Sequence, residues 1–325
     1  MKAVVHTVRP PRKSKKPRRR VRFSRYRRRS AHRTAKRHVT SAGAPASDRS
    51  DYELGYRQGL SDGAEQLLEL CLPSDILIPD ISATEAMAAG VQAMRARAIP
   101  LLGAESVYAE LDGALRERRP YAFIRLGDGE LMTLAQEVVI PVSAVRTSSP
   151  FLPYAGIVVP NLHARDEIAR CIRMASLVGV PISRKPQFQP LLFKTLRAHG
   201  IPCADLKLTT STMNYALHEQ GYLMPLLAGR KVLVVGNVAG ELAQALQLQG
   251  IHIAGVVSPV KGYSDVDRAV SEAVAYDFDI ALVSAGIPAV PIVVRLVQST
   301  GKVAIDFGHS ADRIAGVRTK IKPNE

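Results

Sequence analysis

The sequence lacks several features that would place it in familiar classes of protein. It contains no tryptophan and only three cysteines, Cys71, Cys171 and Cys203, which lie far apart and form no CxxC pair. This spacing argues against a structural zinc site and against a disulfide framework, and it is typical of a reducing compartment, so we expect a cytoplasmic protein. No apolar run reaches the roughly 18–20 residues that a membrane-spanning helix needs.

Acidic residues are missing from the first part of the chain. Residues 1–47 hold 17 of the 44 Lys and Arg residues and none of the 29 Asp and Glu residues, so the formal charge of +15 comes from this segment. The segment contains prolines and serines and shows no helical apolar stripe. We therefore predict a disordered basic tail that binds polyanions non-specifically, whether nucleic acid, anionic lipid or an acidic polymer.

The next segment, residues 48–106, is expected to be helical. Gly55, Gly59 and Gly63 repeat every four residues and would share one face of a helix. Each glycine costs about 1 kcal/mol of helix propensity, so a helix that depends on a partner and a weakly helical linker both fit the pattern. We assign this range to a helical accessory segment that precedes an α/β domain at 107–325.

From residue 121 onward, strand-like and helix-like segments alternate. Apolar runs without polar alternation, such as VLVV at 232–235, are typical of parallel strands buried on both faces. The sequence therefore predicts a Rossmann-like, doubly wound α/β fold with a mostly parallel sheet. The expected strands are 121–126, 178–183, 231–235, 251–257, 279–284 and 302–306. The expected helices are 83–102, 104–118, 165–177, 188–199, 212–227, 240–249, 264–277 and 289–299.

Two carboxylates follow the first predicted strand, in the sequence Gly127-Asp128-Gly129-Glu130. On a loop that glycine allows to bend, Asp128 and Glu130 can point toward one place and offer oxygen ligands to a divalent cation beside a phosphate. Asp-Gly is also common turn chemistry, and this alternative explains the segment when it is considered alone.

Other predicted strands also end in glycine or polar residues. The residues at these ends are Gly236 and Asn237, Gly286, and Asp306 with His309. In parallel α/β sheets, ligands bind beyond the carboxyl ends of the strands, so we expect these residues to lie near the acidic pair. The segment 209–215, rich in hydroxyl and amide side chains, could contact a sugar or base, or could cap a helix.

The glycine turn at 236–240 requires separate consideration. A strand, a glycine turn and a helix can hold a phosphate on the amides of the helix N-terminus. However, the turn reads GNVAG rather than GxGxxG, and no acidic residue ends the next strand, where Val257 leads into Ser258. An NAD or S-adenosylmethionine enzyme is therefore an alternative with weaker support.

Three segments together resemble the GT-D-type glycosyltransferases, bacterial enzymes with a Rossmann-like fold and a metal-binding Asp-x-Glu motif. They are RLGDGEL at 125–131, KVLVVGN at 231–237 and the run from 279 to 309 that ends in DFGH. The resemblance covers roughly residues 107–311. It differs at Leu126, where members with demonstrated sugar transfer usually have an aromatic residue. A non-catalytic, polyanion-binding protein built on a degenerate transferase domain is therefore a second alternative.

The resemblance implies a metal-dependent transferase that uses a nucleotide-sugar, such as a UDP-sugar, and an acceptor that the sequence does not identify. Asp128 and Glu130 would bind Mn²⁺ or Mg²⁺, which bridges the diphosphate of the donor. Asp306 or His309 would complete the metal shell or deprotonate the acceptor hydroxyl. Arg125 would add a cation to the phosphates or form an outward salt bridge. The remaining predicted contacts to the donor are Gly127, Gly129, Gly236, Asn237 and Gly286.

Overall fold

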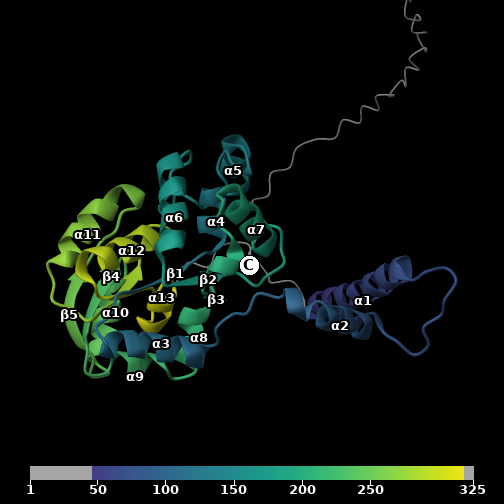
Figure 1. Ribbon diagram of the computed structural model, residues 1–325, viewed down its shortest axis with the longest axis horizontal. Helices are drawn as coiled ribbons and strands as arrows, with labels where there is room; N and C mark the ends of the chain where they lie inside the picture. The colour runs from purple at the N-terminus through teal and green to yellow at the C-terminus, as the bar shows by residue number, and fades with distance from the viewer. Residues whose placement is uncertain (1–45, 318–325) are drawn as a thin grey trace, which may run out of the picture. The chain divides into compact units, whose positions relative to one another are not determined.

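The computed structural model describes residues 46–317 of the 325-residue chain (Figure 1). The chain divides into two compact units between Ala93 and Met94. The boundary expected from the sequence, at residue 106, lies further along, inside helix α3 (Ala104–Arg116). The predicted basic tail lies outside the described residues, except that Ala46 and Ser47 begin helix α1 (Ala46–Cys71).

The first unit is a pair of helices, α1 and α2 (Ala83–Ala93), that pack against each other. Ser82 begins α2 with a capping box: its hydroxyl accepts a hydrogen bond from the amide of Glu85, whose carboxylate accepts one from the amide of Ser82. Glu65 of α1 accepts a hydrogen bond from the amide of Ala83, which ties the two helices together. The helix expected over 83–102 ends at Ala93 and is followed by a short 3₁₀ turn.

The second unit contains a sheet of seven parallel strands in the order β3-β2-β1-β7-β6-β4-β5. The strands are β1 (Tyr121–Arg125), β2 (Leu177–Val180), β3 (Leu208–Thr210), β4 (Lys231–Gly236), β5 (His252–Val257), β6 (Ile280–Ser284) and β7 (Val303–Asp306). The predicted parallel α/β fold is confirmed. Strand β3 was not predicted, because three residues carry too little pattern to identify a strand.

Helices cover both faces of the sheet, as a doubly wound fold requires. Buried residues of one core cluster come from α4 (Asp128–Ala135), α5 (Val142–Ser148), α6 (Leu162–Met174), α7 (Gln189–Ala198), α11 (Val266–Val274) and α12 (Ala289–Thr300). Those of the other come from α3, α8 (Met213–Glu219), α9 (Leu223–Leu227), α10 (Ala239–Gln247) and α13 (Ser310–Ile314). Leu233 packs in the first cluster and Val234 in the second, which explains why β4 is apolar throughout.

Two further local predictions were wrong. The helix expected over 212–227 is two helices, α8 and α9, because Gly221 adopts a positive φ of 79° that ends the first one. The acidic loop expected after β1 is the first turn of α4, which begins at Asp128. Within residues 46–317, no helix has both the length and the apolar character that crossing a membrane requires.

Candidate functional site

The ends of β1 and β7 lie side by side and bring two of the predicted site residues, Arg125 and Asp306, together. The two strands pair in parallel, with Phe123 opposite Ile305, so the segments that follow them leave the same edge of the sheet. Arg125 is the last residue of β1, and Asp306 is the last residue of β7. The guanidinium of Arg125 donates hydrogen bonds to the Oδ1 atom and to the backbone oxygen of Asp306, both at 2.9 Å.

Arg125 also hydrogen-bonds the end of a third strand, β3. Its Nη1 donates to the backbone oxygen of Ser211, directly after β3, at 3.0 Å. Two glycines make room for the side chain: a Cβ on Gly308, where φ is +49°, would lie 1.9 Å from Nη2, and one on Gly179 would lie 3.0 Å from Cγ. Arg125 is therefore held by a salt bridge and hydrogen bonds inside the protein, rather than pointing outward as one alternative expected.

The carboxylates of the acidic pair belong to the N-terminus of α4. Glu130 folds back, and its Oε2 accepts a hydrogen bond from the amide of Gly127 at 2.7 Å, while Oδ1 of Asp128 accepts one from the amide of Gly129 at 2.9 Å. Negative charge is favourable at this end of a helix. Gly129 is buried, and a Cβ there would lie 3.0 Å from Cδ1 of Ile287, so the turn packs against the segment after β6.

Glu130 and Asp306 form an electrostatically unusual pair. Burial, together with the nearby charge of Asp306, raises the pKa of Glu130 to about 7. Burial also raises the pKa of Asp306, and Arg125 opposes this effect. Asp306 is buried and Glu130 is partly buried, and Arg125 is the cation close to both carboxylates. The pair has an excess of negative charge that a bound divalent cation would compensate.

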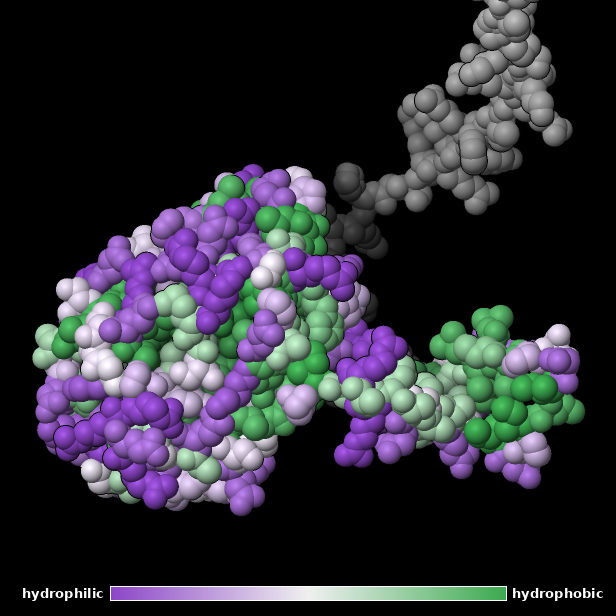
Figure 2. All heavy atoms as spheres, viewed as in Figure 1, coloured by the Kyte–Doolittle hydropathy of each residue, from purple (hydrophilic) through white to green (hydrophobic). Residues whose placement is uncertain are grey.

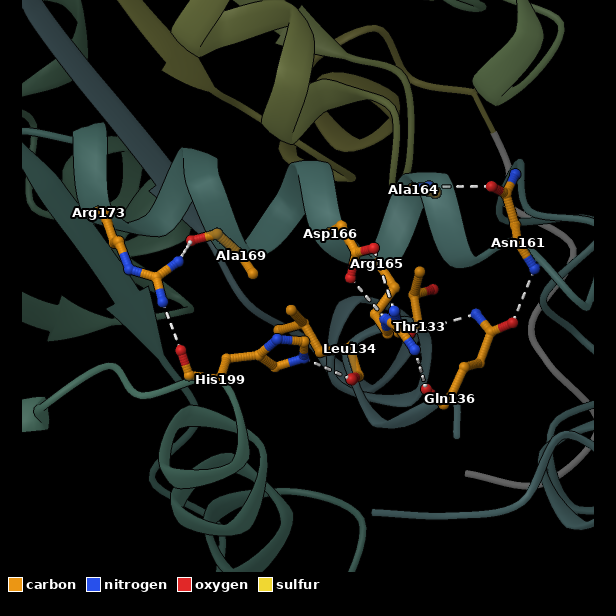
Figure 3. Close-up of polar contacts among 10 residues, drawn as sticks. All are labelled: Thr133, Leu134, Gln136, Asn161, Ala164, Arg165, Asp166, Ala169, Arg173 and His199. Carbon is orange, nitrogen blue, oxygen red and sulfur yellow. Dashed lines mark hydrogen bonds and ion pairs between the residues drawn. The ribbon is translucent and has the colours of Figure 1, made fainter. Parts of the chain in front are cut away.

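The far end of α4 is fixed by a polar network (Figure 3). The buried Gln136 accepts a hydrogen bond from the amide of Asn161 and donates one to the backbone oxygen of Thr133. Arg165 of α6 donates to the backbone oxygen of Gln136, and the ring of His199, just after α7, bonds the backbone oxygen of Leu134 at 2.9 Å. Cationic and polar side chains thus hydrogen-bond the free carbonyls at the C-terminal end of α4. These bonds fix the helix whose first turn carries the acidic pair.

The other predicted strand-end residues have defined packing roles. Gly236 has a φ of +145°, and a Cβ there would lie 2.1 Å from the backbone oxygen of Ser284 in the neighbouring strand β6. Gly286 has a φ of +65°, and its Cβ would lie 2.7 Å from the backbone oxygen of Ala155. Asn237 is also engaged, because its Oδ1 accepts a hydrogen bond from the amide of Val260 at 2.9 Å. These contacts join the ends of β4, β5 and β6.

His309 lies at the surface of the segment that follows β7. Its side chain is 63% exposed, and Nδ1 lies 2.9 Å from Oδ2 of Asp312 in α13. Asp306, three residues earlier, is only 3% exposed. Of the two residues predicted as a base or as metal ligands, His309 is therefore accessible to solvent and Asp306 is buried.

Three polar groups at the same edge of the sheet lack hydrogen-bond partners. Of the four buried side-chain nitrogen or oxygen atoms without a partner in the described chain, three are Oδ1 of Asn214, Oγ of Ser284 and Oγ of Ser310. They follow β3, end β6 and follow β7, respectively. Nδ2 of Asn214 donates to the backbone oxygen of Phe307 at 2.8 Å. Unpartnered buried groups require an explanation such as water or a bound ligand. The predicted polar segment 209–215 includes Asn214. Ser284 and Ser310 were not predicted, because a single serine gives no recognisable signal in the sequence.

Between residues 46 and 317, no three His, Cys, Asp or Glu side chains come close enough to enclose a metal by themselves. Mg²⁺ in proteins is usually held by one or two carboxylates, with substrate phosphates and water completing its shell. Asp128 and Glu130 supply carboxylate oxygens of this kind, and the excess negative charge beside Asp306 favours a cation. The donor set therefore fits a metal that is shared with a phosphate ligand.

Several solved structures are similar to this chain. A structure described as a new glycosyltransferase (DUF1792) from Streptococcus sanguinis has 17% sequence identity and a TM-score of 0.46, covering 69% of this chain and 88% of the other. A second, described as domain of unknown function 1792 with a distinct glycosyltransferase fold, has 16% identity and a TM-score of 0.44, covering 69% and 84%. No curated protein matches the sequence.

The family of the chain follows from its sequence. The family model described as a GT-D fold-like domain matches residues 102–314, which is well over half of the chain. The match spans the sheet, the acidic first turn of α4 and the segment from Asp306 to His309. The chain therefore belongs to the GT-D-like family.

Proposed function

We propose that this protein is a metal-dependent glycosyltransferase that moves a sugar from a UDP-linked donor to a hydroxyl group of an acceptor. The observation that carries the proposal is the acidic first turn of α4, where Glu130 lies close to Asp306 and to the partly buried cation Arg125, and Asp128 is two residues from Glu130. Membership of the GT-D-like family supports the reaction class. The carboxyl edge of the parallel sheet, where these groups gather, is where such folds bind nucleotides.

In this proposal, Asp128 and Glu130 hold Mn²⁺ or Mg²⁺ through their carboxylate oxygens. When bound, the metal would neutralise the negative charge that develops on the diphosphate as the anomeric C–O bond breaks. The hydrogen bond from the amide of Gly127 fixes the direction of the Glu130 carboxylate. Arg125 favours the ionised form of Asp306 and holds this carboxylate in place. In this proposal, Gly236 and Gly286, at the ends of the neighbouring strands, allow the donor to approach the backbone there.

Deprotonation of the acceptor hydroxyl needs a base that solvent and substrate can reach. His309 meets this requirement, because its side chain is exposed and Asp312 orients it through Nδ1. Asp306 meets it less well, because it is buried and bonded to Arg125. We therefore propose His309 as the base and Asp306 as a group that adds negative charge beside the metal.

The proposal is tested by measuring the binding of UDP by calorimetry with and without Mn²⁺. We expect UDP to bind only when the metal is present, and we expect Glu130→Ala to abolish this binding. Glu105→Ala is the matched control, because Glu105 is an exposed acidic residue in the first turn of another helix, α3. If the folded wild-type protein binds no UDP with Mn²⁺ or Mg²⁺, the proposal is wrong.

We also propose that the basic segment 1–47 binds polyanions without contributing to catalysis. It holds 17 Lys and Arg residues and no acidic residue. A chain without residues 1–45 should lose its retention on heparin while it keeps metal-dependent UDP binding. Equal retention of the full and shortened chains on heparin would contradict this role.

A further inference from the structure

Helix α1 has an exposed apolar stripe. The stripe consists of five large side chains that are between 63% and 82% exposed: Tyr52, Tyr56, Leu60, Leu67 and Leu70. Successive members of a helix that are three or four residues apart lie on one face, and Gly63 fills the gap between Leu60 and Leu67. The rings of Tyr52 and Tyr56 stack with their centroids 6.5 Å apart, as expected for neighbours within the stripe.

The other faces of α1 are accounted for. Ala64 and Leu68, which are partly buried, lie on the side that packs against α2. Three exposed acidic residues, Asp51, Asp62 and Glu69, lie on a third side, and Glu65 next to them bonds the start of α2. Glu53 is also exposed and lies at the border of the apolar stripe. The stripe is thus neither the contact with α2 nor the charged surface, and it contains no charged side chain.

Helix α2 of the same unit also exposes large apolar residues. Met87 and Val91, one turn apart, are 56% and 67% exposed. Figure 2 shows hydrophobic residues gathered on the unit formed by α1 and α2. With roughly 150–200 Å² for each large side chain and about two thirds of that area exposed, seven such residues offer on the order of 700–900 Å² of apolar surface. Patches of this size mark interaction sites rather than ordinary protein surface.

We propose that the occupant of this surface is the same unit of a second copy of the chain, and that the two helical pairs form a four-helix bundle. Tyr56, Leu60, Gly63, Leu67 and Leu70 alternate steps of four and three residues, which is the spacing of helices that pair along a seam. About 800 Å² per partner is what a stable interface of standard size buries.

Two further features suit pairing with an identical copy. A two-fold arrangement brings the same stripe of each copy together, and an uncharged stripe meets its own image without repulsion. The acidic side of α1 would stay in water. Nothing lies within 4 Å of a Cβ built on Gly63, so this position leaves open space within the seam for the backbone of a partner helix.

The experiment is sedimentation velocity of the full chain after nuclease treatment, in about 0.5 M salt, which suppresses association through polyanions. We expect a dimer that dissociates reversibly on dilution. Leu60→Lys/Leu67→Lys should be monomeric. Leu248→Lys should remain dimeric, because Leu248 is an even more exposed leucine, at 84%, but lies in the second unit.

A milder variant guards against loss of the helices themselves. Leu60→Ala/Leu67→Ala keeps helix propensity, and we expect it to raise the dissociation constant at least about tenfold while the helical circular dichroism is unchanged. The proposal is overturned if the wild type is a monomer from about 1 to 100 µM, or if the Lys variant dimerises as well as the wild type does.

Discussion

The two units of the chain treat their apolar residues differently. In the second unit, β4 places Leu233 and Val234 on opposite faces of the sheet, and both are fully buried because helices cover each face. In the first unit, of the side chains described from residue 50 to residue 93, Ala83 is the one apolar side chain that is fully buried. Both units contain many apolar side chains. Only in the second unit does a sheet, covered by helices on both faces, bury them.

The comparison also concerns charge. The second unit buries Arg125 and Asp306 as an ion pair and leaves Glu130 partly covered beside them. The acidic residues of α1, such as Glu65 and Glu69, are exposed to water. Buried charges respond strongly to substitution and pH, whereas exposed charges respond little. This difference between the units leads to the following expectations, in order of decreasing effect.

Removal of the buried cation should have the largest effect. Arg125→Met leaves Asp306 buried without its cation, and we expect it to lower the free energy of unfolding by about 3–5 kcal/mol in urea titrations. In the first unit, Glu65→Ala breaks the hydrogen bond between α1 and α2 and should cost only about 0.5–1.5 kcal/mol. Similar losses for the two variants would remove the contrast between the units. Arg125→Met/Asp306→Asn should recover part of the stability, because the unpaired charge is gone.

The pH dependence of stability should differ between Glu130 and an exposed glutamate. Since the pKa of Glu130 is raised from 4.5 to about 7 in the folded protein, its ionisation opposes folding, and the wild type loses stability as the pH rises through this range. Glu130→Gln should therefore match the wild type near pH 4 and exceed it by about 1–3 kcal/mol near pH 8 in the absence of metal.

Glu69→Gln, on the exposed acidic side of α1, is the control for this measurement and should show no such dependence. Unfolding is followed by urea titration at several pH values. A difference between Glu130→Gln and the wild type that stays constant from pH 4 to pH 8 would show that Glu130 ionises like an ordinary exposed carboxylate.

The smallest effect concerns the same substitution in the two units. Gly55 lies within α1, and nothing lies within 4 Å of a Cβ built on it, so Gly55→Ala should stabilise the first unit by about 0.5–1 kcal/mol. Gly301 ends α12 with a φ of +69°, and Gly301→Ala should destabilise the second unit by about 1 kcal/mol. Thermal melts of the two variants should therefore shift in opposite directions, and shifts of the same sign would contradict this expectation.

Much of the fold could be predicted from local pattern. Unbroken apolar runs such as VLVV identified the buried parallel strands, and glycine and polar residues after them marked the carboxyl edge of the sheet. Two of the wrong predictions, the acidic loop after β1 and the single helix over 212–227, could have been avoided from local sequence patterns. Glu130, three residues after Gly127, is a helix-capping pattern, and Gly221 is a typical helix end.

The chemistry of the site could be predicted only in part. The acidic pair was visible in sequence, but the bond between Arg125 and Asp306 joins residues 181 positions apart and depends on β1 and β7 being neighbours. Strand order is not encoded in any local pattern. The same holds for the unpartnered Oγ atoms of Ser284 and Ser310, whose burial follows from the packing around them. Local pattern thus locates the edge of the site, and tertiary structure determines its charge.

The central claim is that a divalent metal and the donor diphosphate meet at the first turn of α4. Anomalous diffraction from crystals grown with Mn²⁺ and UDP tests it most directly. We predict an anomalous peak about 2.0–2.6 Å from carboxylate oxygens of Asp128 and Glu130, with the diphosphate bound to the same ion. Ordered UDP at another place on the protein, with no Mn²⁺ at these carboxylates, would contradict the claim.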